Sequence, residues 1–168
     1  MIMHRRKFKR LIDAEAVKSA IQAAERETSG EIRVSVSTFF WGSVHRAAVR
    51  AFDRLGMRAT KDRNGILFFV VPSRRRFAVL GDEGIHARVG QAFWDGVASA
   101  MSGSFHEGDF TGGLVKGIEE AGRRLAEHFP YQGERDVNEL PDDVDFGEKE
   151  SQPPKLQAID ETDASRRK

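Results

Sequence analysis

The sequence contains no cysteine, which excludes disulfides, thiol catalysis and zinc–thiolate sites. It has no long hydrophobic run, because the longest one, residues 66–71, is far too short to cross a bilayer. The basic residues near the N-terminus are not followed by the apolar stretch of a signal peptide. We therefore expect a cytoplasmic protein without a transmembrane segment. The formal net charge of +1 gives no general attraction to nucleic acid, and we expect no nucleic-acid partner.

Catalytic motifs are also scarce. There is no Gly-x-Ser-x-Gly nucleophile elbow, no Walker loop and no dinucleotide-binding fingerprint. The five histidines are scattered and form no His-Glu-x-x-His pair. Nucleophilic catalysis therefore has little support. A metal-activated water is the one catalytic option that the sequence leaves open.

What the sequence does contain is a regular alternation of helical and strand patterns. The first two expected helices begin at good N-caps, Asp13 and Ser43, and each is closed by a glycine. The expected helices run from Asp13 to Gly30, from Ser43 to Gly56, and over residues 85–101 and 111–128. The expected strands cover residues 31–38, 66–71 and 76–81.

This order predicts an α/β fold, a three-layer α/β/α sandwich with a small mixed sheet flanked by about four helices. The first two strands are joined through a helix and should form a parallel, right-handed crossover. The last two strands are joined only by residues 72–75 and should form an antiparallel hairpin. Residues 66–71 are apolar on both sides, which indicates a central strand with helices on both faces.

Composition divides the chain into four parts. We expect a basic N-terminal arm at residues 1–12, the α/β domain at 13–130, an acidic extended arm at 131–150 and a disordered tail at 151–168. Glycines in the last expected helix cost roughly 1 kcal/mol each relative to alanine, which indicates either close approach to another element or a marginal helix. These glycines are Gly112, Gly113, Gly117 and Gly122.

Acidic side chains are expected to gather at one edge of the sheet. The hairpin sets residue 66 opposite residue 81, so the residues just before one strand lie beside those just after the other. A parallel first strand brings its first residue to the same edge. Carboxylates crowded in this way repel each other unless a proton or a cation intervenes, and oxygen ligands favour Ca²⁺ or Mg²⁺. The predicted metal ligands are Glu31, Asp62, Asn64, Asp82 and Glu83.

Each of these residues also has a simpler interpretation. Asn64 and the glycine after it are typical of a turn. Asp82 or Glu83 could cap a helix. Glu31 could be a solvated carboxylate or could pair with Arg33. The sequence alone leaves these alternatives open.

Two surface features remain open in the same way. The run of arginines at residues 74–76 is more simply a solvated turn than a docking site for an anionic partner, and the basic N-terminal arm could touch an anionic membrane surface. Trp41 and Trp94 could be exposed for recognition or buried under a neighbouring helix. Asp109 is most simply a helix cap or a first-turn acid.

The central part of the chain resembles the TPM domain, a family that includes a thylakoid lumen protein associated with photosystem II repair. Four stretches carry the resemblance: residues 28–34 (TSGEIRV), 64–70 (NGILFFV), 81–85 (GDEGI) and 105–110 (FHEGDF) followed by Gly113 and Gly117. The end of the domain, residues 128–131 (HFPY), is similar to that of short soluble bacterial members.

This resemblance implies an α/β/α sandwich with a divalent cation, usually calcium, at an acidic sheet edge. It implies a role either in the assembly or repair of membrane protein complexes or as an acid phosphatase. Our first hypothesis is therefore a cation-binding interaction module with an unidentified protein partner, acting as a monomer. The alternatives are a weak metal-dependent phosphatase acting on phosphomonoesters, and a purely structural metal site.

Overall fold

The computed structural model describes residues 11–37, 41–133 and 138–147. Its elements are α2 (Ala14–Glu25), β1 (Glu31–Val36), α3 (Val44–Arg54), β2 (Gly65–Val71), the 3₁₀ turn η1 (Pro72–Arg74), β3 (Arg76–Gly81), α4 (Glu83–His86), α5 (Gln91–His106) and α6 (Phe110–His128). The side chains of Asp13, Ser43 and Asp109 cap α2, α3 and α6. The capping predictions at these three residues are confirmed.

The three strands form one mixed sheet in the order β1-β2-β3. β1 runs parallel to β2, with Glu31 beside Gly65. β2 and β3 form the expected antiparallel hairpin, which sets Val71 opposite Arg76 and Ile66 opposite Gly81. The predicted register is confirmed, because the short connection through η1 leaves the two strands little freedom to slip.

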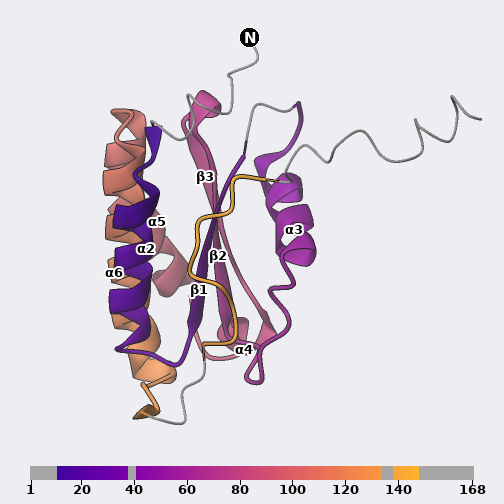
Figure 1. Ribbon diagram of the computed structural model, residues 1–168, viewed down its shortest axis with the longest axis vertical. Coiled ribbons are helices and arrows are strands. Elements are labelled where there is room, and N and C mark those ends of the chain that lie inside the picture. The colour runs from indigo at the N-terminus through magenta and orange to yellow at the C-terminus, as the bar shows by residue number, and fades with distance from the viewer. Residues whose placement is uncertain (1–10, 38–40, 134–137, 148–168) are drawn as a thin grey trace, which may run out of the picture.

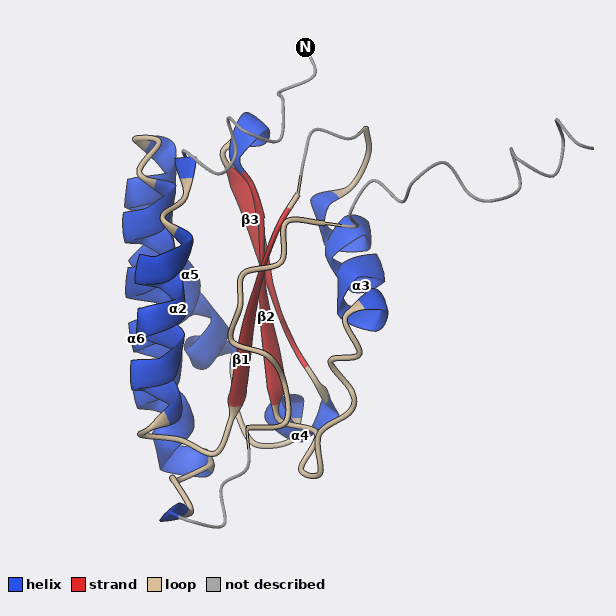
Figure 2. Ribbon diagram, in the orientation of Figure 1, coloured by secondary structure: helices blue, strands red, loops and turns tan. Residues whose placement is uncertain are grey.

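The sheet lies between two layers of helices (Figures 1 and 2). α2, α5 and α6 cover one face, and α3 covers the other. Alternate residues of β2 serve the two sides: Ile66, Phe68 and Val70 join the larger core, and Leu67 and Phe69 join the smaller one. The central position expected for this strand, and the three-layer α/β/α architecture, are therefore confirmed.

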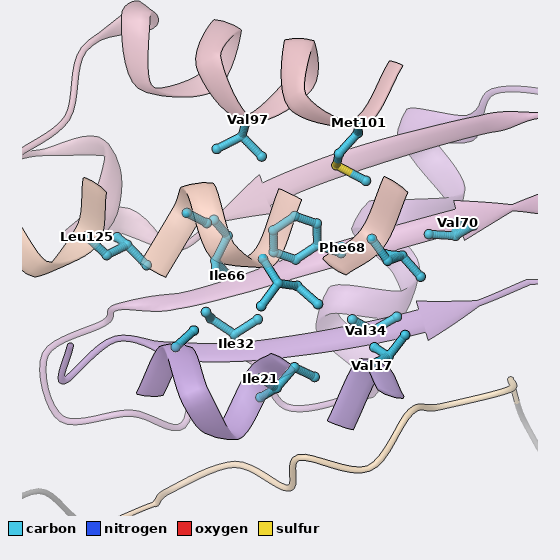
Figure 3. Packing of buried hydrophobic residues seen from close by; sticks show 14 of the residues in the cluster. Val17, Ile21, Ile32, Val34, Ile66, Phe68, Val70, Val97, Met101 and Leu125 are labelled. Carbon is cyan, nitrogen blue, oxygen red and sulfur yellow. The ribbon is translucent and has the colours of Figure 1, made fainter. Parts of the chain in front are cut away.

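Glycines of α6 allow three helices to pack closely on one face of the sheet. A Cβ on Gly113 would lie 2.5 Å from the Phe105 ring, and one on Gly117 would lie 2.6 Å from the Met101 side chain, both on α5. A Cβ on Gly122 would lie 2.7 Å from the Cβ of Ala24 on α2. α6 is therefore the central helix of this layer. Figure 3 shows α2 on the β1 side of the sheet and α5 on the β3 side.

Residues 138–147 lie along the outer edge of β1 as an extended segment. Asp145 pairs with Ser35 in a parallel bridge, and two backbone hydrogen bonds join Asp145 to Val34 and Val36. Leu140 is buried in the smaller core. This segment covers the edge of β1 that does not pair with β2.

Two helix predictions were wrong in their extent. The helix expected at residues 85–101 is two helices, α4 and α5, because Gly90 adopts an extended conformation between them. The first helix ends at Glu25 and not near Gly30. Thr28 forms a bridge with Pro130, and its hydroxyl donates to the Phe129 carbonyl, so long-range contacts hold this segment extended.

Other expectations fall outside the described residues. These are Thr38 at the end of the first strand, most of the basic arm and the whole C-terminal tail. Among the helices that the structure describes, none is long and apolar enough to cross a membrane.

Candidate functional site

The candidate site lies at the end of the sheet where β1 begins and β3 ends, and we call it the acidic corner. It comprises Glu31, residues 60–64 before β2, and residues 82–84 after β3. The Glu31 amide donates to the Asn64 carbonyl at 3.2 Å, and the Asp82 amide donates to the Gly65 carbonyl at 2.9 Å. The backbone segments that carry Glu31, Asn64 and Asp82 therefore meet at this corner, as the sequence predicts.

Residues 60–64 and 82–84 are packed directly against each other. The Gly84 amide donates to the Arg63 carbonyl at 2.9 Å. A Cβ on Gly84 would lie 2.2 Å from the Asp62 carbonyl oxygen and 2.6 Å from that of Arg63. Only glycine allows two backbones to approach this closely. The loop that carries Asp62 is thereby fixed beside the turn that carries Asp82 and Glu83.

The Asp82 carboxylate is held by Arg63. Arg63 Nε donates to Oδ2 at 2.6 Å and Nη2 donates to Oδ1 at 2.9 Å, a two-pronged pair. Oδ1 also caps α4 by accepting from the Glu83 amide at 2.8 Å. The Asp82 side chain is only 3% exposed. Burial alone would raise the pKa of Asp82, but the bonds from Arg63 and from the Glu83 amide outweigh it and lower that pKa.

Arg63 adopts a left-handed backbone conformation with φ of 50°. This region costs a non-glycine residue roughly 1 kcal/mol. Thr60 supports the turn, since its carbonyl accepts from the Arg63 amide and its hydroxyl accepts from the Asn64 amide. A turn does precede β2, but its left-handed residue is Arg63, whereas Gly65 is already the first residue of the strand. The consequence of this turn is that the Arg63 side chain is directed to Asp82.

Glu31 is buried and does not extend into solvent. Its side chain is 3% exposed, and Oε1 accepts from the Glu139 amide at 3.0 Å. Glu139 in turn accepts from the Lys61 amide at 2.9 Å. The alternative interpretation of Glu31 as a solvated carboxylate is therefore wrong, because residues 138–147 cover it.

Asn64 is the most deeply buried polar residue of the corner, at 1% exposure. Its Nδ2 donates to the Ser29 carbonyl at 3.1 Å, which ties β1 to β2. Its Oδ1 is buried and accepts no hydrogen bond from the residues that the structure describes. An unpaired buried acceptor is costly, so this oxygen has capacity for a water or a ligand.

The corner divides into two groups. Glu31 and Asp82 lie on either side of Gly65, one on each neighbouring strand of β2. Their backbones are therefore about 9.5 Å apart, which is twice the distance between neighbouring strands. Met57 and Leu140 lie over Gly65 between them. By backbone position, Asp62, Asp82 and Glu83 fall in one group, and Glu31 and Asn64 fall in the other. Within the described parts of the chain, no group of three or more acidic or histidine side chains is arranged to hold a metal ion.

A depression of about 210 Å³ adjoins the first group, and we call it the β3 pocket. Val49, Phe52 and Leu80 supply its apolar walls. Asp82, Glu83, His86 and Arg58 supply its polar rim. The pocket opens beside the end of β3, on the α3 side of the sheet.

Sequence reasoning missed Arg63 and Glu139. Arg63 stands between two predicted ligands, and a basic residue among carboxylates is a signal for an ion pair that was available in the sequence. Glu139 gave no such signal, because its contact with Glu31 depends on how a distant segment folds back.

Comparison with known proteins identifies relatives. The sequence model of the TPM domain matches residues 10–124. The BA42 protein of the psychrophilic bacterium Bizionia argentinensis, solved by NMR, is 39% identical with a TM-score of 0.76 and covers 80% of this chain and 92% of its own. No curated protein matches.

Two more distant structures share the fold. The N-terminal domain of the Corynebacterium glutamicum protein cg2496 is 14% identical with a TM-score of 0.53, covering 81% of this chain and 78% of its own. The N-terminal domain of a P. gingivalis protein is 16% identical with a TM-score of 0.58, covering 70% and 77%.

Proposed function

Because the chain belongs to the TPM domain family, we propose that it is a protein-interaction module whose acidic corner binds one Ca²⁺ or Mg²⁺ ion. Asp82 is the central ligand in this proposal, and Asp62 and Glu83 lie beside it. The bound ion fixes residues 60–64 against residues 82–84 and so sets the shape of the surface offered to a protein partner. The partner itself is not identified.

The Arg63–Asp82 pair is the observation that carries this proposal. A carboxylate buried to this extent needs a positively charged partner. Either a guanidinium or a hard cation can neutralise it. The Arg63 side chain is 37% exposed and reaches Asp82 from the surface. It can therefore move into solvent when a cation takes its place. In this proposal Arg63 neutralises Asp82 when no ion is bound.

Glu31 and Asn64 have a supporting role in this proposal. They lie on the far side of Gly65 from Asp82, and their visible bonds join β1 to residue 139 and to Ser29. They thereby fix the ends of the strands from which the ligands project. The purely structural alternative requires the ion to bind without any effect on a partner.

Thermal unfolding in the presence of millimolar Ca²⁺ or Mg²⁺ tests the proposal. Binding to the folded state raises the melting temperature as the ion concentration increases. Arg63→Gln removes the competing guanidinium, so its ion-dependent shift should exceed that of the wild type. Asp82→Asn should abolish the shift. Arg46→Gln, which removes an exposed arginine at the start of α3, is the matched control.

Absence of any ion-dependent shift in both the wild type and Arg63→Gln would overturn the cation site. A shift that persists in Asp82→Asn would place the ion elsewhere. Turnover of a generic phosphomonoester separates the phosphatase alternative from the interaction module. That activity should depend on the ion and should disappear in the Asp62→Asn, Asp82→Asn double variant.

A further inference from the structure

The outer edge of β3 carries backbone groups that do not bond to any residue that the structure describes. The hydrogen bond from the Asp82 amide to Gly65 marks these opposite residues as a hydrogen-bonded pair. Such pairs alternate along an antiparallel ladder, so residues 76, 78 and 80 also bond to β2. The amides and carbonyls of Phe77, Val79 and Gly81 therefore point outward. No described residue donates to them or accepts from them.

This edge lacks the features that usually protect an exposed strand. β3 has no proline, no lysine and no bulge among its six residues. Half-buried apolar side chains flank it on both faces. Phe77, Val79 and Trp94 lie on the α5 side, and Leu80 lies beside the β3 pocket on the α3 side. The opposite edge of the sheet differs, because Asp145 already pairs with β1 there.

A second copy of the chain does not fit this edge. The axes of packed helices are about 9 Å apart, whereas neighbouring strands are about 4.8 Å apart. Because α6 lies over β2, the axis of its neighbour α5 lies about 4 Å beyond β3. Figure 3 shows α5 on this side of the sheet. If two copies paired their β3 strands around a twofold axis, the axes of their two α5 helices would be about 4 Å apart. Packed helices need a distance of about 8–10 Å between their axes. A single strand without its own helix layer avoids this collision.

We propose that the edge of β3 docks one extended peptide segment of a protein partner, which adds to the sheet as a fourth, antiparallel strand. The outward groups of Phe77, Val79 and Gly81 supply the backbone hydrogen bonds. α5 covers one face of the added strand, and the β3 pocket receives a side chain from its other face. The site borders the proposed cation site, because Glu83 belongs to both, but its backbone pairing does not require the ion.

Charge at the two ends of β3 sets the direction and composition of the peptide. Arg76 is exposed where β3 begins, and Glu83, with a side chain 84% exposed, follows where β3 ends. An antiparallel peptide therefore needs a basic residue near its start, beside Glu83, and an acidic residue near its end, beside Arg76. Its residue opposite Leu80 faces the apolar walls of the β3 pocket and should be large and apolar.

Residue-resolved amide hydrogen exchange of the full chain, in a chelator, tests this proposal. The probe is the end-blocked peptide Lys-Val-Leu-Val-Thr-Val-Glu. In the free protein the amides of Phe77, Val79 and Gly81 should exchange quickly, whereas those of residues 78, 80 and 82 are protected by β2. Saturating peptide should slow the three outward amides at least tenfold. The inward amides are the internal control.

Two matched comparisons test backbone pairing and charge. The same peptide with N-methyl groups on the amides that face β3 should give no protection. Arg76→Glu should weaken binding several-fold, and Arg46→Glu, with an equal charge change on α3, should not. A peptide whose terminal Lys and Glu are exchanged should bind the wild type less well than the original.

Three results would overturn the proposal. The peptide could leave the exchange of residues 77, 79 and 81 unchanged. These amides could already be protected in a free protein that sediments as a monomer, which would show that the chain's own residues occupy the edge. They could also be protected in a dimer, which would make a second copy the occupant. Because a chelator is present, none of these results bears on the cation site.

Discussion

Asp145 pairs with Ser35 through both backbone and side chain, although the two residues are 110 positions apart. The Ser35 hydroxyl donates to Asp145 Oδ2 at 2.8 Å, and Arg54 Nη2 donates to the same oxygen at 2.7 Å. The segment after α6 is therefore attached to β1 and to α3 at one carboxylate. This attachment covers the outer edge of β1, the strand that begins at Glu31.

Acid should weaken this attachment. Burial alone would raise the pKa of Asp145, but the hydrogen bonds from Arg54 and Ser35 outweigh it and lower that pKa. A carboxyl with a lowered folded-state pKa contributes stability above its unfolded pKa of about 3.9 and loses it as the pH falls through the folded value. The melting temperature should fall below about pH 4, and in Asp145→Asn part of this pH dependence should be missing.

At neutral pH, Asp145→Asn should destabilise the fold by on the order of 1–2 kcal/mol, because a charged acceptor is lost while the shape is kept. Asp143→Asn is the control, since Asp143 pairs with Lys18 in an exposed position. Equal losses in both variants would show that the Ser35–Asp145 pairing contributes little.

Gly122 should tolerate no side chain, whereas Gly103 should accept one. Both lie inside helices, where alanine is favoured over glycine by roughly 1 kcal/mol. A Cβ on Gly122 would meet Ala24 at 2.7 Å, but one on Gly103 would meet nothing within 4 Å. Gly103→Ala should therefore raise the melting temperature, and Gly122→Ala should lower it. Stabilisation by both substitutions would mean that α2 and α6 are not in close contact.

Gly84→Ala should displace residues 60–64 from the turn after β3. The atoms that its Cβ would meet are backbone carbonyl oxygens, which cannot move aside as a side chain can. We expect a loss of roughly 1–3 kcal/mol, the usual range for an overpacked site. Gly90→Ala is the matched control, because nothing lies within 4 Å of that position. Thermal unfolding measures both, and a neutral Gly84→Ala would contradict this packing.

Arg63→Gln should destabilise the protein in the absence of divalent ions by about 2 kcal/mol, because Asp82 then remains buried without a charged partner. The loss should be smaller in an Asp82→Asn background, since the buried charge is gone. Urea unfolding of the four proteins in this double-mutant cycle measures the coupling. Additive losses would show that the two side chains do not depend on each other.

Local features of the sequence predicted much of the fold. Caps at Asp13, Ser43 and Asp109, the two-sided apolar strand and the short hairpin connection are signals carried by neighbouring residues. The glycines of α6 indicated close packing, although not which helices they face. The break between α4 and α5 was missed because the apolar spacing continues across Gly90, where the backbone does not.

The sequence by itself determined where most helices and strands begin, the register of the hairpin and the meeting of distant backbone segments at one end of the sheet, because periodicity, capping and hairpin length act over a few residues. Only the tertiary structure decided which side chains meet there. Arg63 reaches Asp82, residues 138–147 cover Glu31, and α5 projects past the open edge of β3. These relationships depend on the turn of a loop, the return of a distant segment and the difference between helix and strand spacing, and no local pattern encodes them.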